Sequence, residues 1–249
     1  KFITFNNMRT YNIIKVNATK STNDKVKMLI KSKKINNLDI ISAKYQYKGR
    51  GQQNNRWFSS YGNNLLCSLY LKLPNDFNSP LFTINFAATL SVLDTIRFFN
   101  DKKSFIKWPN DILADNNKIS GILIENTFKN NFINYSIIGV GINVNQTNFR
   151  KIRNSTSLKN LCNKNFDVDN VLNELLKNYQ SYFQRIKDIT YLSEKFNQNL
   201  YGKNNCKFLY NEKVFDGKVD KVLNNGNLVA RLETNEPKEF KSSEIKIIF

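Results

Sequence analysis

The sequence predicts an α+β fold followed by a small β domain. Strand-like segments rich in branched apolar residues alternate with amphipathic helical segments over residues 1–202. The polar stretch Gly202-Lys203-Asn204-Asn205 is typical of a linker, and only short strand-like segments follow it, with Asn225-Gly226 as a hairpin turn. We therefore expect one domain over residues 1–202 and a second over residues 203–249.

Length and composition exclude several classes of protein. The chain has 249 residues, is 41% hydrophobic and has apolar runs too short for a membrane span. The first residues, KFITFNN, lack the apolar core of a signal peptide, so a cytoplasmic location is expected. Three cysteines without C-x-x-C spacing argue against disulfides or a zinc site. The sequence contains no His, which excludes His-dependent catalysis and His-ligated metals.

The net charge of +18 raises the alternative of nucleic-acid binding. The surplus Lys residues are spread over the whole chain, however, and no basic cluster coincides with aromatic residues or a recognition helix. We interpret the charge as compositional bias at surface positions and place nucleic-acid binding well behind an enzymatic function. A basic surface would still attract ATP and an acidic protein partner.

The N-terminal half contains four predicted elements. Residues 11–17 form a short strand, and a helix begins with Ser21 or Thr22 as its N-cap. Residues 38–45 and 64–73 are strands by their branched apolar residues. The segment 46–57 between them has no apolar period, so we expect a loop that is mobile when empty and orders over a ligand.

The remaining predicted elements are a long helix, three strands, two helices and a series of short strands. Ser79-Pro80 begins a long helix that reaches Asn100, and residues 105–145 supply three strands. Two amphipathic helices follow, and then short strands to the C-terminal end; in order, these predicted elements cover residues 167–188, 190–200, 207–210, 214–223, 228–232 and 245–249.

The hairpin from Lys107 to Glu125, KWPNDILADNNKISGILIE, carries the first functional signal. Asn110 and Asp111 stand at a strand end after a Trp-Pro break, and the returning strand carries Lys118 and Gly121 three residues apart. The glycine lets a ligand approach the backbone closely, and the lysine places a cation beside it. Such a combination suits a polyanionic ligand with Mg²⁺, although a solvated hairpin rim has the same residue types.

Two further motifs make the signal specific. Gly49-Arg50-Gly51 begins a basic loop that ends in Arg56-Trp57, and GVGINVN follows the hairpin at Gly139–Asn145. In this order and spacing, GRGxxxxRW, KWPND, KISGILIE and GVGINVN resemble the biotin protein ligase family. The resemblance runs from about Ser21 to Asn145. In many relatives a helix-turn-helix repressor domain comes first; these 249 residues leave no room for one, which implies a monofunctional form.

The resemblance implies a fold and a reaction. The fold is a mixed-sheet catalytic domain of the biotin/lipoate ligase type with helices on one side, plus a C-terminal SH3-like β barrel. The enzyme would activate biotin with ATP and Mg²⁺ as biotinyl-5′-AMP and transfer it to a lysine of a biotin carboxyl carrier domain. The family's pairing of edge strands leaves a homodimer open.

The resemblance also carries site roles onto matching residues. Lys118, Arg50 and Asp111 are the expected catalytic residues, with Asp111 either holding Mg²⁺ or orienting and deprotonating the incoming lysine. No fixed metal site is expected. The expected biotin-binding residues are Ser21, Thr22, Asn23, Gln46, Arg50, Gly51, Gln52, Lys118 and Gly121. The expected nucleotide-binding residues are Arg56, Trp57, Asn110, Lys118 and Asn143.

The basic loop departs from the family pattern G-R-G-R-x-G-R-x-W. Gln52 replaces the second Arg, and Asn54 replaces a loop glycine. A hydrogen bond to a charged group contributes about 1.5–3 kcal/mol, so the loss of this charge predicts an adenylate held about ten- to a hundredfold less tightly. The hypothesis is that this enzyme releases more of its activated intermediate than its relatives do, unless Arg56 substitutes.

Two alternatives share the fold. A lipoate or octanoate ligase uses the same adenylate chemistry, but the GRG…RW loop and KWPND favour biotin. A non-catalytic relative that only binds biotin gains some weight from Gln52.

Overall fold

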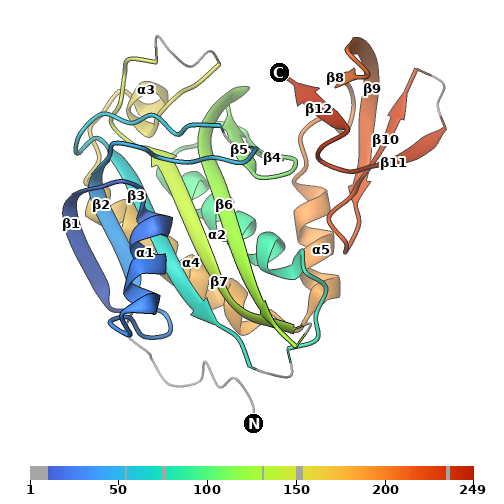
Figure 1. Cartoon of the computed structure of the whole chain (residues 1–249). Helices are drawn as coiled ribbons and strands as arrows, with labels where there is room; N and C mark the ends of the chain where they lie inside the picture. The colour runs from blue at the N-terminus through green and yellow to red at the C-terminus, as the bar shows by residue number, and fades with distance from the viewer. Residues whose placement is uncertain (1–10, 54, 75–76, 131, 150–153, 234–235) are drawn as a thin grey trace.

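Two β-sheets organise the chain in the computed structural model, which describes residues 11–53, 55–74, 77–130, 132–149, 154–233 and 236–249. The larger sheet has seven strands and the smaller sheet has five. They lie side by side, with the C-terminal sheet next to the end of the large sheet that carries β4 and β5 (Figure 1).

The seven-stranded sheet is mixed, because β1 and β2 are parallel and all its other neighbouring strands are antiparallel. From edge to edge its strands are β1 (Ile13–Thr19), β2 (Ile40–Gln46), β3 (Asn64–Lys72), β7 (Phe132–Asn143), β6 (Asn117–Lys129), β5 (Asp111–Ala114) and β4 (Ser104–Lys107). The first eight residues of β3, NLLCSLYL, are all buried, as expected for a central strand that is covered on both faces.

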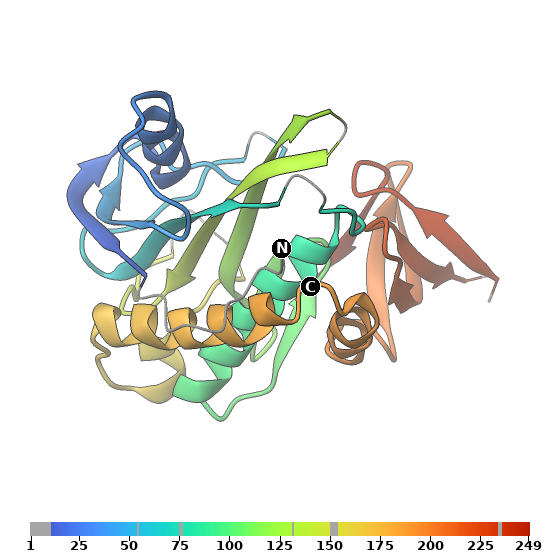
Figure 2. The same cartoon turned by 90° about the horizontal axis from the view of Figure 1, so that it is seen from below.

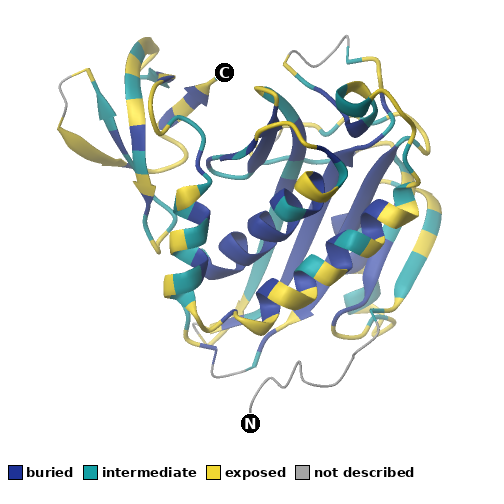
Figure 3. Cartoon of the chain, turned by 180° about the vertical axis from the view of Figure 1, so that it is seen from behind, coloured by how far each residue is buried: buried dark blue, intermediate teal, exposed yellow. Residues whose placement is uncertain are grey.

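Two long helices cover one face of this sheet. They are α2 (Thr83–Phe99) and α4 (Val168–Gln184), which pack against each other below the strands (Figure 2). Most of α2 is buried, whereas α4 keeps an exposed stripe (Figure 3). α5 (Ile189–Gln198) packs on α2 and leads to the small sheet, and α3 (Leu158–Cys162) is a single short turn.

The remaining helix, α1 (Thr22–Lys31), lies on the opposite face. Successive side chains of β2 point to opposite faces of the sheet, and this shows where α1 lies. Ile40 belongs to the main core, whereas Ile41 belongs to a second, smaller core with Val26 of α1. The predicted mixed sheet with helices is therefore confirmed, and its long helices share one side. α1 is the exception to that arrangement, because its apolar stripe packs on the side chains that point away from α2.

The small sheet is antiparallel and compatible with the expected SH3-like domain. Its order is β11 (Pro237–Phe240), β10 (Leu228–Leu232), β9 (Lys213–Val222), β8 (Cys206–Tyr210) and β12 (Ile245–Ile248). The Asn225-Gly226 turn forms as predicted, with Gly226 at a φ of +90° that favours glycine. Trp108 Nε1 donates to the Gly226 carbonyl at 2.9 Å and so joins the two sheets. The domain boundary near residue 202 stays a prediction.

Four local predictions differ from the structure. Residues 105–145 were expected to supply three strands and contain four, β4 to β7, because the chain also forms the four-residue strand β4 before the Trp108-Pro109 break. The helix expected from Ser79 begins at Thr83, because residues 81–82 form a turn first. β11 was not predicted, since it starts at Pro237, and proline is confined to edge strands and strand starts. α3 was not predicted because its five residues are too few to show a helical period.

Candidate active site

A pocket of about 280 Å³ lies where the two sheets meet. The start of α1 and the loop 46–57 form one part of its wall, and the hairpin of β5 and β6 forms another. The strand β7 contributes backbone at its glycines, and the segment 242–247 closes the side next to the small sheet.

The structure brings almost all the predicted site residues to this pocket. Those that line it are Ser21, Thr22, Asn23, Gln46, Arg50, Gly51, Gln52, Arg56, Trp57, Asn110, Asp111, Lys118 and Gly121. They come from four separate elements and lie up to 100 residues apart in the sequence. Asn54, the second departure from the family pattern, lies outside the described residues.

Asn143 is the exception among the predicted residues. It is buried at the end of β7, and its Nδ2 donates to the Thr156 carbonyl at 2.9 Å. Among the described residues, the pocket wall does not include it. The structure therefore gives Asn143 a role in holding the segment after β7, and its contact with a nucleotide stays a prediction.

One end of the pocket is a buried polar network. Gln46 Oε1 accepts from the Thr22 backbone N–H at 2.7 Å and from its hydroxyl at 3.1 Å. The hydroxyl of Ser68, on β3, lies 2.7 Å from Thr22 Oγ1 and donates to Asn23 Oδ1 at 2.6 Å. These contacts fix the direction of each donor and acceptor, so this end suits a small ligand that has both donors and acceptors of its own.

The other polar group is a carboxylate held between two lysines. Lys118 Nζ lies 2.6 Å from Asp111 Oδ1, and Lys107 Nζ lies 3.5 Å from Asp111 Oδ2. Burial lowers the pKa of Lys107, and the neighbouring Asp111 carboxylate opposes this effect. Two ammonium groups against one carboxylate leave a net positive charge, which favours an anionic ligand such as a carboxylate or phosphate.

Glycines form the floor on which Trp57 lies. Gly121 of β6 and Gly141 of β7 are directly paired across the sheet. A Cβ at Gly141 would stand 2.5 Å from the Trp57 ring, and one at Gly121 would stand 3.0 Å from it. Only glycine at both positions lets the indole rest on the sheet backbone, and Lys118 Nζ lies 5.7 Å from the ring centroid.

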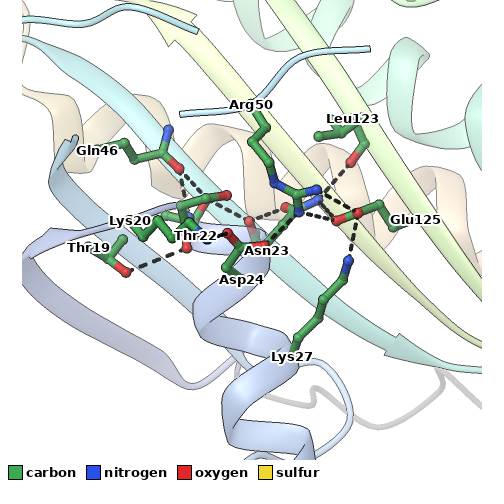
Figure 4. A network of polar contacts seen from close by, with 12 residues as sticks. Thr19, Lys20, Thr22, Asn23, Asp24, Lys27, Gln46, Arg50, Leu123 and Glu125 are labelled. Atoms are coloured by element: carbon green, nitrogen blue, oxygen red, sulfur yellow. Dashed lines mark hydrogen bonds and ion pairs between the residues drawn. The ribbon is translucent and has the colours of Figure 1, made fainter. Parts of the chain in front are cut away.

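Arg50 links the loop 46–57 to the rest of the protein (Figure 4). Its guanidinium binds Glu125 of β6 through two nitrogens, at 3.1 and 2.9 Å, and lies 2.8 Å from Asp24 of α1. Glu125 also accepts from Lys27 and Asn23. Burial alone would raise the pKa of Glu125, but the hydrogen bonds from Lys27, Asn23 and Arg50 together lower it below its usual value.

The sequence reasoning missed two groups of pocket residues. Lys107 stands at the start of the KWPND motif, and Gly139 and Gly141 stand within GVGINVN, so the motifs themselves were the available signal. The second group comes from the small sheet and comprises Ser242, Ile245, Lys246 and Ile247. No local pattern marks this group, because only the packing of the two sheets brings it to the pocket.

The structure adds two negative findings for its described residues. Among them, no group of three or more His, Cys, Asp or Glu side chains is arranged to hold a metal ion. Within the same part of the chain, no helix is both long and apolar enough to cross a membrane.

Fold and site together define a protein with a mixed sheet and a pocket that is lined by this sheet and a basic loop. The Biotin/lipoate A/B protein ligase family model matches residues 16–143, which is half of the chain and includes most of the pocket. The chain belongs to this family.

Relatives and solved structures agree with this assignment. The bifunctional ligase/repressor BirA of Escherichia coli is 33% identical over 108 residues, 43% of this chain and 33% of that protein. BirA of Bacillus subtilis is 30% identical over 222 residues, 84% of this chain and 66% of that protein. Thus the chain spans from about a third to two thirds of these relatives. The biotin protein ligase of Aquifex aeolicus, solved in complex with biotin and ATP, is 26% identical with a TM-score of 0.79, covering 96% of this chain and 99% of that one.

Proposed function

We propose that this chain is an ATP-dependent biotin–protein ligase. It activates biotin as biotinyl-5′-AMP and then transfers the biotinyl group to a lysine of a biotin carboxyl carrier domain. The observation that carries the proposal is that Lys118 and Asp111 lie in one pocket with a buried polar network, beside which Glu125 holds Arg50. The related ligase of Aquifex aeolicus, which shares the fold, was solved in complex with both biotin and ATP.

The two ends of the pocket match the two ends of biotin. The ureido ring carries N–H donors and a carbonyl acceptor, so it fits the network of Thr22, Asn23 and Gln46. The fused rings and the acyl chain are apolar and fit the part of the pocket that Trp57 lines. The carboxylate then reaches Lys118 and Arg50, which neutralise its charge.

Adenylation needs positioning and charge neutralisation more than proton transfer. The biotin carboxylate is already ionised at neutral pH. One of its oxygens attacks the α-phosphorus of ATP, a new O–P bond forms, and the bond to pyrophosphate breaks. Lys118 and Arg50 stabilise the negative charge on the carboxylate and α-phosphate, and Asp111 holds the Lys118 ammonium in place at 2.6 Å.

Transfer requires a nucleophilic amine. The carrier lysine attacks the acyl carbon of the mixed anhydride, an amide bond forms, and AMP leaves with the electrons of the C–O bond. The amine loses one proton in this step, which passes to solvent water. Asp111 is the carboxylate beside the reacting centre, and it accepts a hydrogen bond from the incoming amine and so orients it.

Mg²⁺ fits this site as a companion of ATP rather than as a resident ion. Asp111 is the carboxylate available near the lysines, and Mg²⁺ is commonly bound by one or two carboxylates together with substrate phosphates. Asn110 stands beside it, and its Nδ2 donates to the Ile122 carbonyl at 2.7 Å, which leaves the amide oxygen for a ligand. The ion supplies further neutralisation of phosphate charge.

The test is biotin-dependent exchange of pyrophosphate into ATP, with lipoate as the parallel substrate. Exchange with biotin alone supports the proposal. Exchange with lipoate alone would show that the protein is a lipoate ligase instead. No exchange with either acid would contradict a catalytic function. Lys118→Met should lower exchange by about ten- to a hundredfold, because one charged hydrogen bond is lost. Lys129→Met, which removes an exposed lysine of the same strand, should leave exchange unchanged.

A further inference from the structure

Arg50 makes more contacts with the protein than ligand binding requires. Its two terminal nitrogens bind both oxygens of Glu125, and one of them also lies 2.8 Å from Asp24 (Figure 4). The planar fork of an arginine matches a carboxylate in this two-bond geometry, which fixes the orientation of both groups. The proposed mechanism gives no role to either carboxylate.

The two carboxylates belong to the rigid part of the fold. Asp24 stands in the first turn of α1, and Glu125 stands within β6, which is paired with β7 on one side and β5 on the other. Glu125 is itself held by Lys27 at 2.7 Å and by Asn23 at 2.8 Å. Arg50, in contrast, stands in the loop between β2 and β3, outside the helices and the named strands. The contact therefore ties a loop to a helix and a strand.

The geometry also separates the donors of Arg50 into two sets. The terminal nitrogens are engaged by Glu125 and Asp24, whereas Nε is buried and has no hydrogen-bond partner within the described structure. A buried donor without a partner is costly unless a ligand supplies an acceptor. The two terminal nitrogens thus anchor the Arg50 side chain, and its Nε–H is left to donate a hydrogen bond to a ligand anion.

We propose that Glu125 and Asp24 are positioning residues that clamp Arg50 and so hold the loop 46–57 closed over the pocket. Neither carboxylate touches the ligand; both act through the guanidinium. A loop that is already held in its binding shape loses less conformational freedom when a ligand binds, so the clamp raises affinity. The identity of that ligand rests on the proposed function, whereas the clamp itself does not.

Limited proteolysis of the ligand-free protein tests the clamp directly. Glu125→Gln and Asp24→Asn each remove a charge with little change of shape. Trypsin cleavage within residues 48–56, measured relative to cleavage elsewhere in the chain, should become about tenfold faster in Glu125→Gln. Lys27→Met is the matched control, because it removes the other cation on Glu125 and is not on the loop. Its cleavage should equal that of the wild type.

A double-mutant cycle separates the clamp from general destabilisation. If Glu125 acts through Arg50, Glu125→Gln should add little to the effect of Arg50→Lys, since lysine lacks the two-bond fork. Fully additive effects, or unchanged loop cleavage in both Glu125→Gln and Asp24→Asn, would overturn the proposal. Asp24→Asn keeps the test open if Glu125→Gln fails to fold.

Steady-state exchange gives the second readout. The two clamp variants should raise the biotin concentration for half-maximal exchange about tenfold with a smaller change in the maximal rate. A fall in maximal rate alone, with no change in half-saturation, would contradict a positioning role. If the wild-type protein shows no exchange, the proposed function fails, and the proteolysis result still decides whether the clamp exists.

Discussion

Gly141 shows how a single missing side chain shapes this site. A Cβ there would stand 2.5 Å from the Trp57 ring, against 3.0 Å at Gly121. We expect Gly141→Ala to displace the indole and weaken biotin binding more than Gly121→Ala does, because the first contact is too short for any real pair of atoms. Calorimetric titration with biotin measures the affinity of both variants. Equal affinities in the two variants would contradict this order.

Gln52 carries a prediction about the retention of the intermediate. It lines the pocket where relatives have an arginine, so we expect Gln52→Arg to hold biotinyl-5′-AMP about ten- to a hundredfold more tightly. The measurement is biotin labelling of a bystander protein without a carrier domain, which should be strong with the wild type and weak with Gln52→Arg. If the wild-type protein labels the bystander only at background level, the hypothesis that it releases its activated intermediate is wrong.

At this scale, the residues that belong to motifs could be predicted and their partners could not. Arg50, Lys118 and Asp111 were each found from short patterns in the sequence. The contacts of Arg50 with Asp24 and Glu125 were not, because they join positions far apart in the chain. A charged residue on a strand or helix does not predict which loop will contact it in the folded protein.

Helix α2 is the element on which the main core depends. Leu90 is fully buried on it, whereas Leu81, in the turn before the helix, is 54% exposed. Leu90→Ala should lower the free energy of unfolding by about 2–5 kcal/mol, because the deletion leaves a cavity in a tightly packed core. Leu81→Ala should change it by less than about 1 kcal/mol. Urea denaturation measures the free energy of unfolding of both variants. A similar decrease in the two variants would show that burial does not determine how much each leucine contributes to stability.

Periodicity predicted the long elements and failed for short or exceptional ones. The helix predicted over residues 167–188 is observed as α4 (Val168–Gln184), since its apolar stripe spans several turns. β11 begins with proline and α3 has five residues, so neither offers a pattern to read. The position of α1 on the far face depends on which strand residues face it, and an apolar stripe does not specify its partner.

The stability of the whole protein should depend on pH through Glu125, whose pKa is lowered by the hydrogen bonds from Lys27, Asn23 and Arg50. The pKa of Glu125 is lowered from its usual 4.5 in the folded state, so its ionised form stabilises the fold above that value. This contribution is lost as the pH falls through the lowered pKa. We expect Glu125→Gln to melt at a lower temperature than the wild type at neutral pH, with the difference shrinking below pH 4.5. If the Tm difference between the two proteins stayed constant from neutral pH to below pH 4.5, this prediction would be wrong.

The two-sheet architecture has a consequence for protein synthesis. The wall of the pocket runs from Ser21 to Ile247, so its residues are made at widely separated times during translation. Strand β7, whose backbone contributes to the floor, is made after both of its neighbours, β3 and β6, and β12 emerges from the ribosome long afterwards. A nascent chain can therefore build its sheet and helices while it is still being made. It gains a complete pocket only when β12 has been released.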